Sequence, residues 1–161
     1  MGRHDNEVRV QLSVLDRLID YEPEMSREAA ASRSKNLRIL KQAVRRDLEW
    51  LLNTRQNPEL SAELKEVQSS VAAYGLPDFT NLAARNPSDQ QRLRRAIEKA
   101  IEDFEPRLEG VVVAFDAAAA GSEKAVRFRI DGRLKVDPAP EPVVFDTLLE
   151  IGSGEFEVKG D

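Results

Sequence analysis

Apolar residues near the start of the chain recur at the spacing of an α-helix. The first group is Val8, Leu12, Leu15 and Ile19. These intervals of four, three and four residues predict an amphipathic helix from about Glu7 to Asp20. Residues 21–33 have no such period and include Pro23, so they are predicted to form a flexible linker. A helix on a linker can pack on its own domain or on a partner protein, and both placements are open at this point.

A second and a third helix are predicted in the next part of the chain. The second is expected to begin at Ser34, which can serve as its N-cap, and to end near Asn53. Its apolar stripe is Leu37, Leu40, Val44, Leu48 and Leu51. The third is expected to begin after Asn57, with Pro58 in its first position, and to stop at Gly75. Its stripe is Leu60, Leu64, Val67, Val71 and Tyr74.

A fourth helix is predicted to open with a capping box, in which Gln91 follows Ser88 by three residues. Its stripe is Leu93, Ala96, Ile97, Ala100, Ile101 and Phe104. Pro106 ends this helix at Glu105, because proline disfavours the α conformation in the residue before it. In an extended segment, side chains two residues apart project to the same side, so Glu105 and Arg107 are expected to lie together. This pair of opposite charges can bind a partner or tie the chain to its own backbone.

From Gly110 onward the apolar period changes from helical to alternating, which predicts β-strands. The first two strands carry Val111, Val113 and Phe115, and then Val126, Phe128 and Ile130. A two-residue hairpin at Asp131 and Gly132 would pair Ile130 with Arg133, an apolar residue with a charged one, so this hairpin is rejected. The second strand is instead expected to continue to Leu134 and Val136, with Gly132 as a bend or bulge.

A third strand is predicted after the prolines at 138, 140 and 142. One face of this strand carries Val143, Phe145, Thr147, Leu149 and Ile151. A two-residue turn at Ser153 and Gly154 would pair Ile151 with Phe156 and Leu149 with Val158, so a terminal hairpin is favoured. The predicted fold class is therefore α+β, with N-terminal helices packed on a small C-terminal antiparallel β-sheet. Residues 34–161 are expected to form a single domain, preceded by a helix and linker in residues 1–33.

Composition excludes several kinds of partner. Charged residues make up 33% and hydrophobic residues 41% of the 161 residues, and no apolar run approaches membrane-spanning length. The chain has no cysteine and no recognisable signal peptide, which favours an intracellular protein without direct membrane insertion. Basic residues between Lys35 and Arg46 are broken by Asp47 and Glu49 and have no interleaved aromatics. A solvated helix face is therefore favoured over a nucleic-acid site.

Residue types that carry catalysis or bind metals are scarce. The chain has one histidine, His4, and no cysteine, which leaves no candidate metal site and no activated serine. We therefore expect no metal and no cofactor. Cleaving a glycosidic bond needs little beyond two placed carboxylates, so a peptidoglycan glycosidase that uses Glu105 and Asp103 is the enzymatic alternative. The two carboxylates would have to lie about 5 to 9 Å apart in a cleft, and a proline between helix and sheet predicts no cleft.

Six segments, spread in order along nearly the whole chain, resemble one protein family. They are Ser13–Asp20, Asp47–Arg55, Tyr74–Phe79, Phe104–Leu108, Phe128–Leu134 and Val143–Thr147. Together they resemble the TssE family of baseplate subunits from bacterial type VI secretion systems, akin to the lysozyme-named wedge protein of contractile phage baseplates. The resemblance implies a structural, non-enzymatic protein in the bacterial cytoplasm, at the base of a contractile injection apparatus.

The resemblance also implies roles for individual residues. Glu105, Pro106 and Arg107 would dock on a helical core bundle contributed by the wedge subunits TssF and TssG. The sheet would seed polymerisation of the sheath subunits TssB and TssC by strand exchange. The expected sheath-contacting strand carries Val143, Phe145, Thr147 and Leu149, with main-chain bonds giving affinity and side chains giving register. A regulatory adaptor of similar fold, which binds another protein through the same surface, is a third hypothesis.

Overall fold

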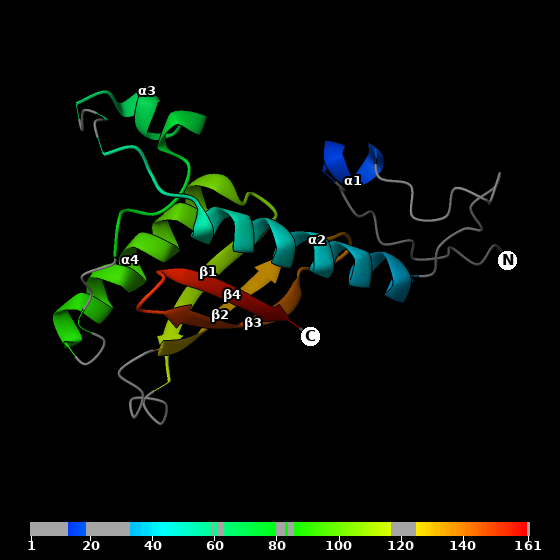
Figure 1. The fold of residues 1–161 in the computed structure, drawn as a ribbon. Helices are drawn as coiled ribbons and strands as arrows, with labels where there is room; N and C mark the ends of the chain where they lie inside the picture. The colour runs from blue at the N-terminus through cyan, green and yellow to red at the C-terminus, as the bar shows by residue number, and fades with distance from the viewer. Residues whose placement is uncertain are drawn as a thin grey trace, which may run out of the picture.

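The computed structural model describes residues 13–18, 33–58, 60, 63–79, 83, 86–116 and 125–160 (Figure 1). Helices come first and strands last, which confirms the predicted α+β class. The helical elements are α1 (Val14–Leu18), α2 (Arg33–Asn53), α3 (Lys65–Gln68), the 3₁₀ turn η1 (Val71–Ala73) and α4 (Pro87–Phe104). The strands are β1 (Leu108–Phe115), β2 (Ala125–Leu134), β3 (Glu141–Glu150) and β4 (Glu155–Gly160).

The four strands form one antiparallel sheet in the order β1-β2-β3-β4. Helix α2 packs mainly against β4 and helix α4 against β1, and both helices cover the same face of the sheet (Figure 1). The strand residues on that face are buried as the alternating pattern predicts, whereas their neighbours are largely exposed. The fully buried side chains between the two layers include Leu40, Leu48, Leu51, Leu93, Ile97, Ile101, Ile130 and Leu149.

The two long helices follow their predicted stripes, with small differences at their ends. Helix α2 starts at Arg33, so the predicted cap Ser34 lies inside the helix. Helix α4 starts at Pro87, and the side chain of Asn86 accepts a hydrogen bond from the Ser88 N–H at 2.9 Å. The predicted capping box at Ser88 is therefore wrong. Asparagine followed by proline caps this helix instead, because proline lacks the N–H that would otherwise need a partner.

The predicted third helix is wrong as a continuous element. Among the residues of this region that the structure describes, the helical elements are the four-residue α3 and the three-residue η1, and Pro58 lies in a turn. Two residues of the expected stripe, Leu64 and Val71, are 55% and 87% exposed. An amphipathic helix in a protein depends on burial of its apolar face, and here these stripe residues meet no second layer.

Gly75 has a different role from the helix stop that was predicted. The main chain around it pairs with the end of α2, where the Leu76 N–H donates to Thr54 O and the Gln56 N–H donates to Leu76 O, each at 2.8 Å. Gly75 has φ +112°, and a Cβ at this position would lie 2.4 Å from Thr54 O. Glycine is required here because two backbone segments approach closely.

Strand β2 continues through Gly132 as predicted, but the bulge lies on its neighbour. Glu109 pairs with Arg133 and Val112 pairs with Asp131, so two residues of β1 oppose Gly132. The terminal hairpin is confirmed with a shifted register, in which Leu149 pairs with Phe156. The shift amounts to two residues, so the same side chains face the helices because the side-chain period of a strand is two. Within the part of the chain that the structure describes, no helix is long and apolar enough to cross a membrane.

Candidate functional site

The chain turns from α4 into β1 at a corner that main-chain hydrogen bonds hold in place. The Glu105 N–H still donates to Ile101 O at 2.8 Å, as in the preceding helical turn. Glu105 itself has φ −121° and ψ 76°, outside the helical region. The Lys135 N–H donates to Arg107 O at 2.8 Å, which ties the other end of the corner to the chain just after β2. The direction of the Glu105 and Arg107 side chains is therefore set by the backbone.

Glu105 and Arg107 form a two-pronged ion pair across Pro106. The Nε and Nη2 atoms of Arg107 donate to Oε1 and Oε2 of Glu105 at 2.7 and 2.5 Å, and the Arg107 N–H donates to Oε1 at 3.2 Å. The predicted juxtaposition of these two residues is confirmed. Glu105 is only 4% exposed, whereas Pro106 is exposed. The corner therefore presents its proline outward and its carboxylate inward.

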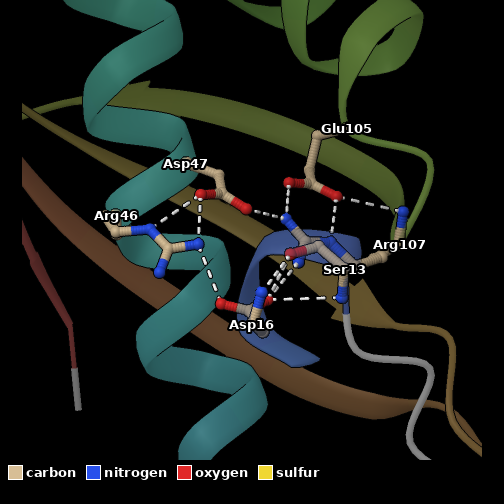
Figure 2. A network of polar contacts seen from close by, with 6 residues as sticks. All are labelled: Ser13, Asp16, Arg46, Asp47, Glu105 and Arg107. Atoms are coloured by element: carbon tan, nitrogen blue, oxygen red, sulfur yellow. Dashed lines mark hydrogen bonds and ion pairs between the residues drawn. The ribbon is translucent and has the colours of Figure 1, made fainter. Parts of the chain in front are cut away.

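Two residues of α2 extend this ion pair into a network (Figure 2). Asp47 Oδ2 accepts from Arg107 Nη2 at 2.6 Å, and Asp47 Oδ1 accepts from Arg46 Nε and Nη2 at 3.0 and 2.8 Å. The carboxylate of Asp47 thus bridges two guanidinium groups. It connects α2 to a corner that lies 60 residues further along the chain.

Helix α1 joins the network through Asp16. Its carboxylate accepts from Arg46 Nη2 at 2.9 Å and lies 3.8 Å from Arg107 Nη1. Ser13 holds the same carboxylate with a hydroxyl hydrogen bond of 2.6 Å. Asp16 is buried, whereas Val14 and Leu18 are 69% and 77% exposed. The described part of the predicted first helix therefore packs on its own chain, and it is attached through the polar side chain of Asp16 rather than through an apolar stripe. The rest of that helix and residues 21–32 lie outside the described residues.

The surroundings of Arg107 and Asp16 favour the charged forms of these two groups. Burial opposes charge on the Arg107 guanidinium, but the bonds and charge of Glu105, followed by those of Asp47, raise its pKa above the ordinary value. Burial would raise the pKa of Asp16, but hydrogen bonds from Ser13 and Arg46 hold its pKa below the ordinary 3.8. Burial raises the pKa of Tyr74, and the charges of Asp47 and Glu105 add to this effect. At neutral pH the Asp16 carboxylate and the Arg107 guanidinium are therefore charged, and the Tyr74 hydroxyl is neutral.

A groove of about 740 Å³ opens between α1, α2 and the corner. Its apolar walls include Val14, Leu15, Trp50, Tyr74, Phe104 and Pro106, and the network contributes charged residues to the same groove. Trp50 is 52% exposed, and Arg46 stacks on its ring at 5.0 Å. Exposed aromatics beside arginines are typical of protein-binding surfaces.

The carboxylates of the enzymatic alternative are arranged differently. Asp103 accepts from Lys99 Nζ at 2.7 Å on α4, whereas Glu105 is bonded to Arg107 inside the corner. The groove is lined by Glu105 but not by Asp103. Among the described residues, no group of three or more histidine, cysteine or acidic side chains could hold a metal ion.

The expected sheath-contacting residues lie in the middle of the sheet. Strand β3 is paired with β2 on one side and with β4 on the other. Its side chains Val143, Phe145, Thr147 and Leu149 are buried beneath the helices. The outermost strands of the sheet are β1 and β4.

Sequence reasoning did not select Asp16, Arg46 and Asp47 as site residues. A signal for two of them is present in the helical pattern. Intervals of four, three and four residues separate Leu40, Val44, Asp47 and Leu51, so a carboxylate occupies a position of the apolar stripe. Asp16 stands in the same way between Leu12 and Ile19. An acidic residue in an apolar stripe indicates a buried cation nearby.

The family model for baseplate wedge protein gp25 matches residues 38–139, more than half of the chain. The chain belongs to the gp25 baseplate wedge family. This family includes TssE of type VI secretion systems, which confirms the resemblance seen in the sequence. Membership identifies a structural component of a phage or type VI secretion baseplate. No curated protein and no solved structure matches the chain.

Proposed function

We propose that this wedge-family protein is the TssE-type subunit of a type VI secretion baseplate, in the bacterial cytoplasm at the base of the apparatus. It docks on the core bundle of TssF and TssG through the corner at Glu105, Pro106 and Arg107. The observation that carries the proposal is the groove at this corner, where aromatic and aliphatic walls lie beside arginines. Interfaces obtain most of their binding energy from such aromatic and arginine anchors.

The three corner residues contribute to docking in different ways. Glu105 is buried and accepts three hydrogen bonds from Arg107, so it holds the guanidinium and the direction of the chain. Pro106 is exposed and meets the partner directly. Arg107 Nη1 is buried and makes no hydrogen bond, with Asp16 3.8 Å away. A partner acceptor takes this donor when α1 moves aside, because an unmade hydrogen bond to a charged group is costly.

Substitution of Trp50 tests docking without removing a core residue. Trp50→Ala should weaken co-purification with co-expressed TssF and TssG by at least about tenfold, because exposed aromatic anchors typically contribute about 2 kcal/mol or more. The matched control is Val112→Ala, since Val112 is 56% exposed on the opposite face of the sheet. Unchanged binding of Trp50→Ala, with wild-type binding of the control, would count against docking at this groove. Equal unfolding midpoints for both variants show that the comparison reports on binding.

We infer that the protein has no glycosidase activity. The carboxylate of Glu105 is engaged by three N–H donors of Arg107, and Asp103 is paired with Lys99, so neither is placed as a free general acid. Cell-wall suspensions should keep their turbidity in the presence of the wild-type protein. A fall in turbidity that Glu105→Gln abolishes would reinstate the enzymatic hypothesis.

We further propose that the sheet seeds a sheath of TssB and TssC by accepting an extended strand next to β4. Support comes from the strand order, in which β4 is an edge strand whose inner side is paired with β3. Lysine cross-linking of a baseplate bound to sheath tests this placement. Lys159 on β4 should cross-link to the sheath, whereas Lys99 on α4 should not; their side chains are similarly exposed, 67% and 69%. Sheath cross-links at Lys99 alone would contradict the proposal.

A further inference from the structure

The outer edge of β4 is occupied by side chains of α2. In an antiparallel pair, alternate residues direct their main-chain groups toward the neighbouring strand and the others direct theirs away. Phe156 and Val158 belong to the second kind, since their main-chain groups are bonded to α2. An uncovered edge strand is a template for another strand, so the way in which α2 covers this one bears on strand addition.

Asn53 bonds to Phe156 as a neighbouring strand would. The Phe156 N–H donates to Asn53 Oδ1 at 2.8 Å, and Asn53 Nδ2 donates to Phe156 O at 2.8 Å. A side-chain amide has one carbonyl and N–H donors, so it reproduces the two exchanged bonds of a hydrogen-bonded residue pair. Asn53 is the last residue of α2, and its Nδ2 also donates to Glu49 O at 2.9 Å. The amide is thus held in position from the helix.

Arg45 covers the next outward-facing position along β4. Its Nη1 donates to Val158 O at 3.0 Å and also contacts Glu49 Oε2 at 3.3 Å. Arg45, Glu49 and Asn53 follow one another at intervals of four residues, so they lie on one side of α2. We call these three residues the α2 edge cover. The cover satisfies main-chain groups of both Phe156 and Val158.

We propose that the α2 edge cover is a strand surrogate that closes the β4 edge until a sheath strand replaces it. The inference rests on the proposed sheath-seeding function and adds the condition under which seeding occurs. An incoming extended segment can offer a C=O to the Phe156 N–H and an N–H to each of Phe156 O and Val158 O, so the exchange conserves the hydrogen bonds that Asn53 and Arg45 release. Phe156 and Val158 keep their buried side chains beneath α2 during this exchange. The side chains that release β4 are those of Asn53 and Arg45.

The closing experiment compares Asn53→Ala with Thr54→Ala in the full-length protein. Thr54 is the matched control because its hydroxyl donates to Trp50 O at 2.7 Å, at the same end of α2, without contacting β4. In Asn53→Ala, hydrogen exchange of the Phe156 amide should be about two- to tenfold faster than in the wild type, as expected for loss of one hydrogen bond. Thr54→Ala should leave this rate unchanged. An unchanged hydrogen-exchange rate of the Phe156 amide in Asn53→Ala would overturn the proposal that Asn53 acts as a strand surrogate.

Sheath nucleation is then measured by light scattering after each variant is mixed with TssB and TssC. Asn53→Ala should shorten the lag before polymerisation, and Arg45→Ala should shorten it less, because one bond rather than two is lost. Faster exchange of the Phe156 amide with an unchanged lag would overturn the proposal that the α2 edge cover delays strand addition. Concentration-dependent dimers of Asn53→Ala with an unchanged lag also overturn it and assign the edge to a second copy of this chain. Cross-links of wild-type Lys159 to the sheath distinguish failure of the proposed function from failure of this inference. If they are absent, strand addition next to β4 is wrong; if they are present, only the role of the α2 edge cover is wrong.

Discussion

Two of the polar residues through which helix α2 contacts later parts of the chain differ in kind. Asp47 binds the partly buried guanidinium of Arg107, and Asn53 binds the main chain of Phe156 at the outer edge of β4. At the first contact, loss of either partner leaves a partly buried charge without its counterpart. At the second, the groups are neutral and another strand can supply the same bonds. The comparison indicates that the contact of Asp47 with Arg107 is a fixed one, whereas the contact of Asn53 with the β4 edge can be exchanged for another strand.

Removal of the corner cation should have the largest effect on stability. In Arg107→Ala, the carboxylates of Glu105, Asp47 and Asp16 remain close together without the shared cation. We expect the free energy of unfolding, measured in urea, to fall by about 3 kcal/mol, in the range for a broken buried ion pair. Arg129→Ala is the control, because Arg129 pairs with Asp131 on the exposed face and should cost less than about 1 kcal/mol. Equal losses for the two variants would remove the distinction between corner and surface.

Isosteric exchange of amide and carboxylate separates the two contacts more finely. Asp47→Asn keeps the shape of the side chain but removes the charge that bridges Arg46 and Arg107, and should cost about 2 kcal/mol. Asn53→Asp keeps the acceptor for the Phe156 N–H but loses the donor to Phe156 O and Glu49 O, and should cost about 1 kcal/mol. Urea unfolding of both variants measures the difference. A larger loss for Asn53→Asp would reverse the assignment of fixed and exchangeable contacts.

Protonation of Asp16 at low pH should detach α1, and this should have the smallest of the expected effects on the free energy of unfolding. The pKa of Asp16 is lower in the folded protein than its ordinary 3.8, so its contribution to stability is present above that pH and is lost as pH falls through the folded-state pKa. The free energy difference between the wild type and Asp16→Asn should therefore be constant near neutral pH and shrink below about pH 3.8. We expect a difference of about 1 kcal/mol near neutral pH. A difference that already declines between pH 7 and 5 would contradict the assigned role of Asp16.

Much of the fold was predictable because its signals are local. The stripes of α2 and α4 and the alternation of β2 and β3 identified the buried faces, since side-chain periods of 3.6 and 2 follow from backbone geometry. The third helix failed because a stripe shows only that a segment can be amphipathic. Whether Leu64 and Val71 are buried depends on a second layer that is absent at these residues. The hairpin register failed by two residues because that shift leaves every side chain on the same face.

The candidate site was predictable in part. Pro106 placed Glu105 and Arg107 together, since the backbone at a proline has few conformations. The remaining members of the network are 60 or more residues from Arg107 in the sequence, and their spacing carries no mark of the contact. Asp16 and Asp47 occupy apolar stripe positions, which signals a buried partner but does not identify it.

The amino-acid sequence was enough to identify the core-facing residues of α2, α4 and the strands, the end of α4 and the family of the chain. These properties depend on short-range geometry and on an ordered set of local motifs. The contact of Asp47 with Arg107, and the cover that Asn53 forms on the β4 edge 103 residues later in the chain, depend on how the helices and the sheet pack together. A polar side chain finds its partner according to where packing of the apolar faces places the two segments. That placement is a property of the assembled layers of helix and sheet.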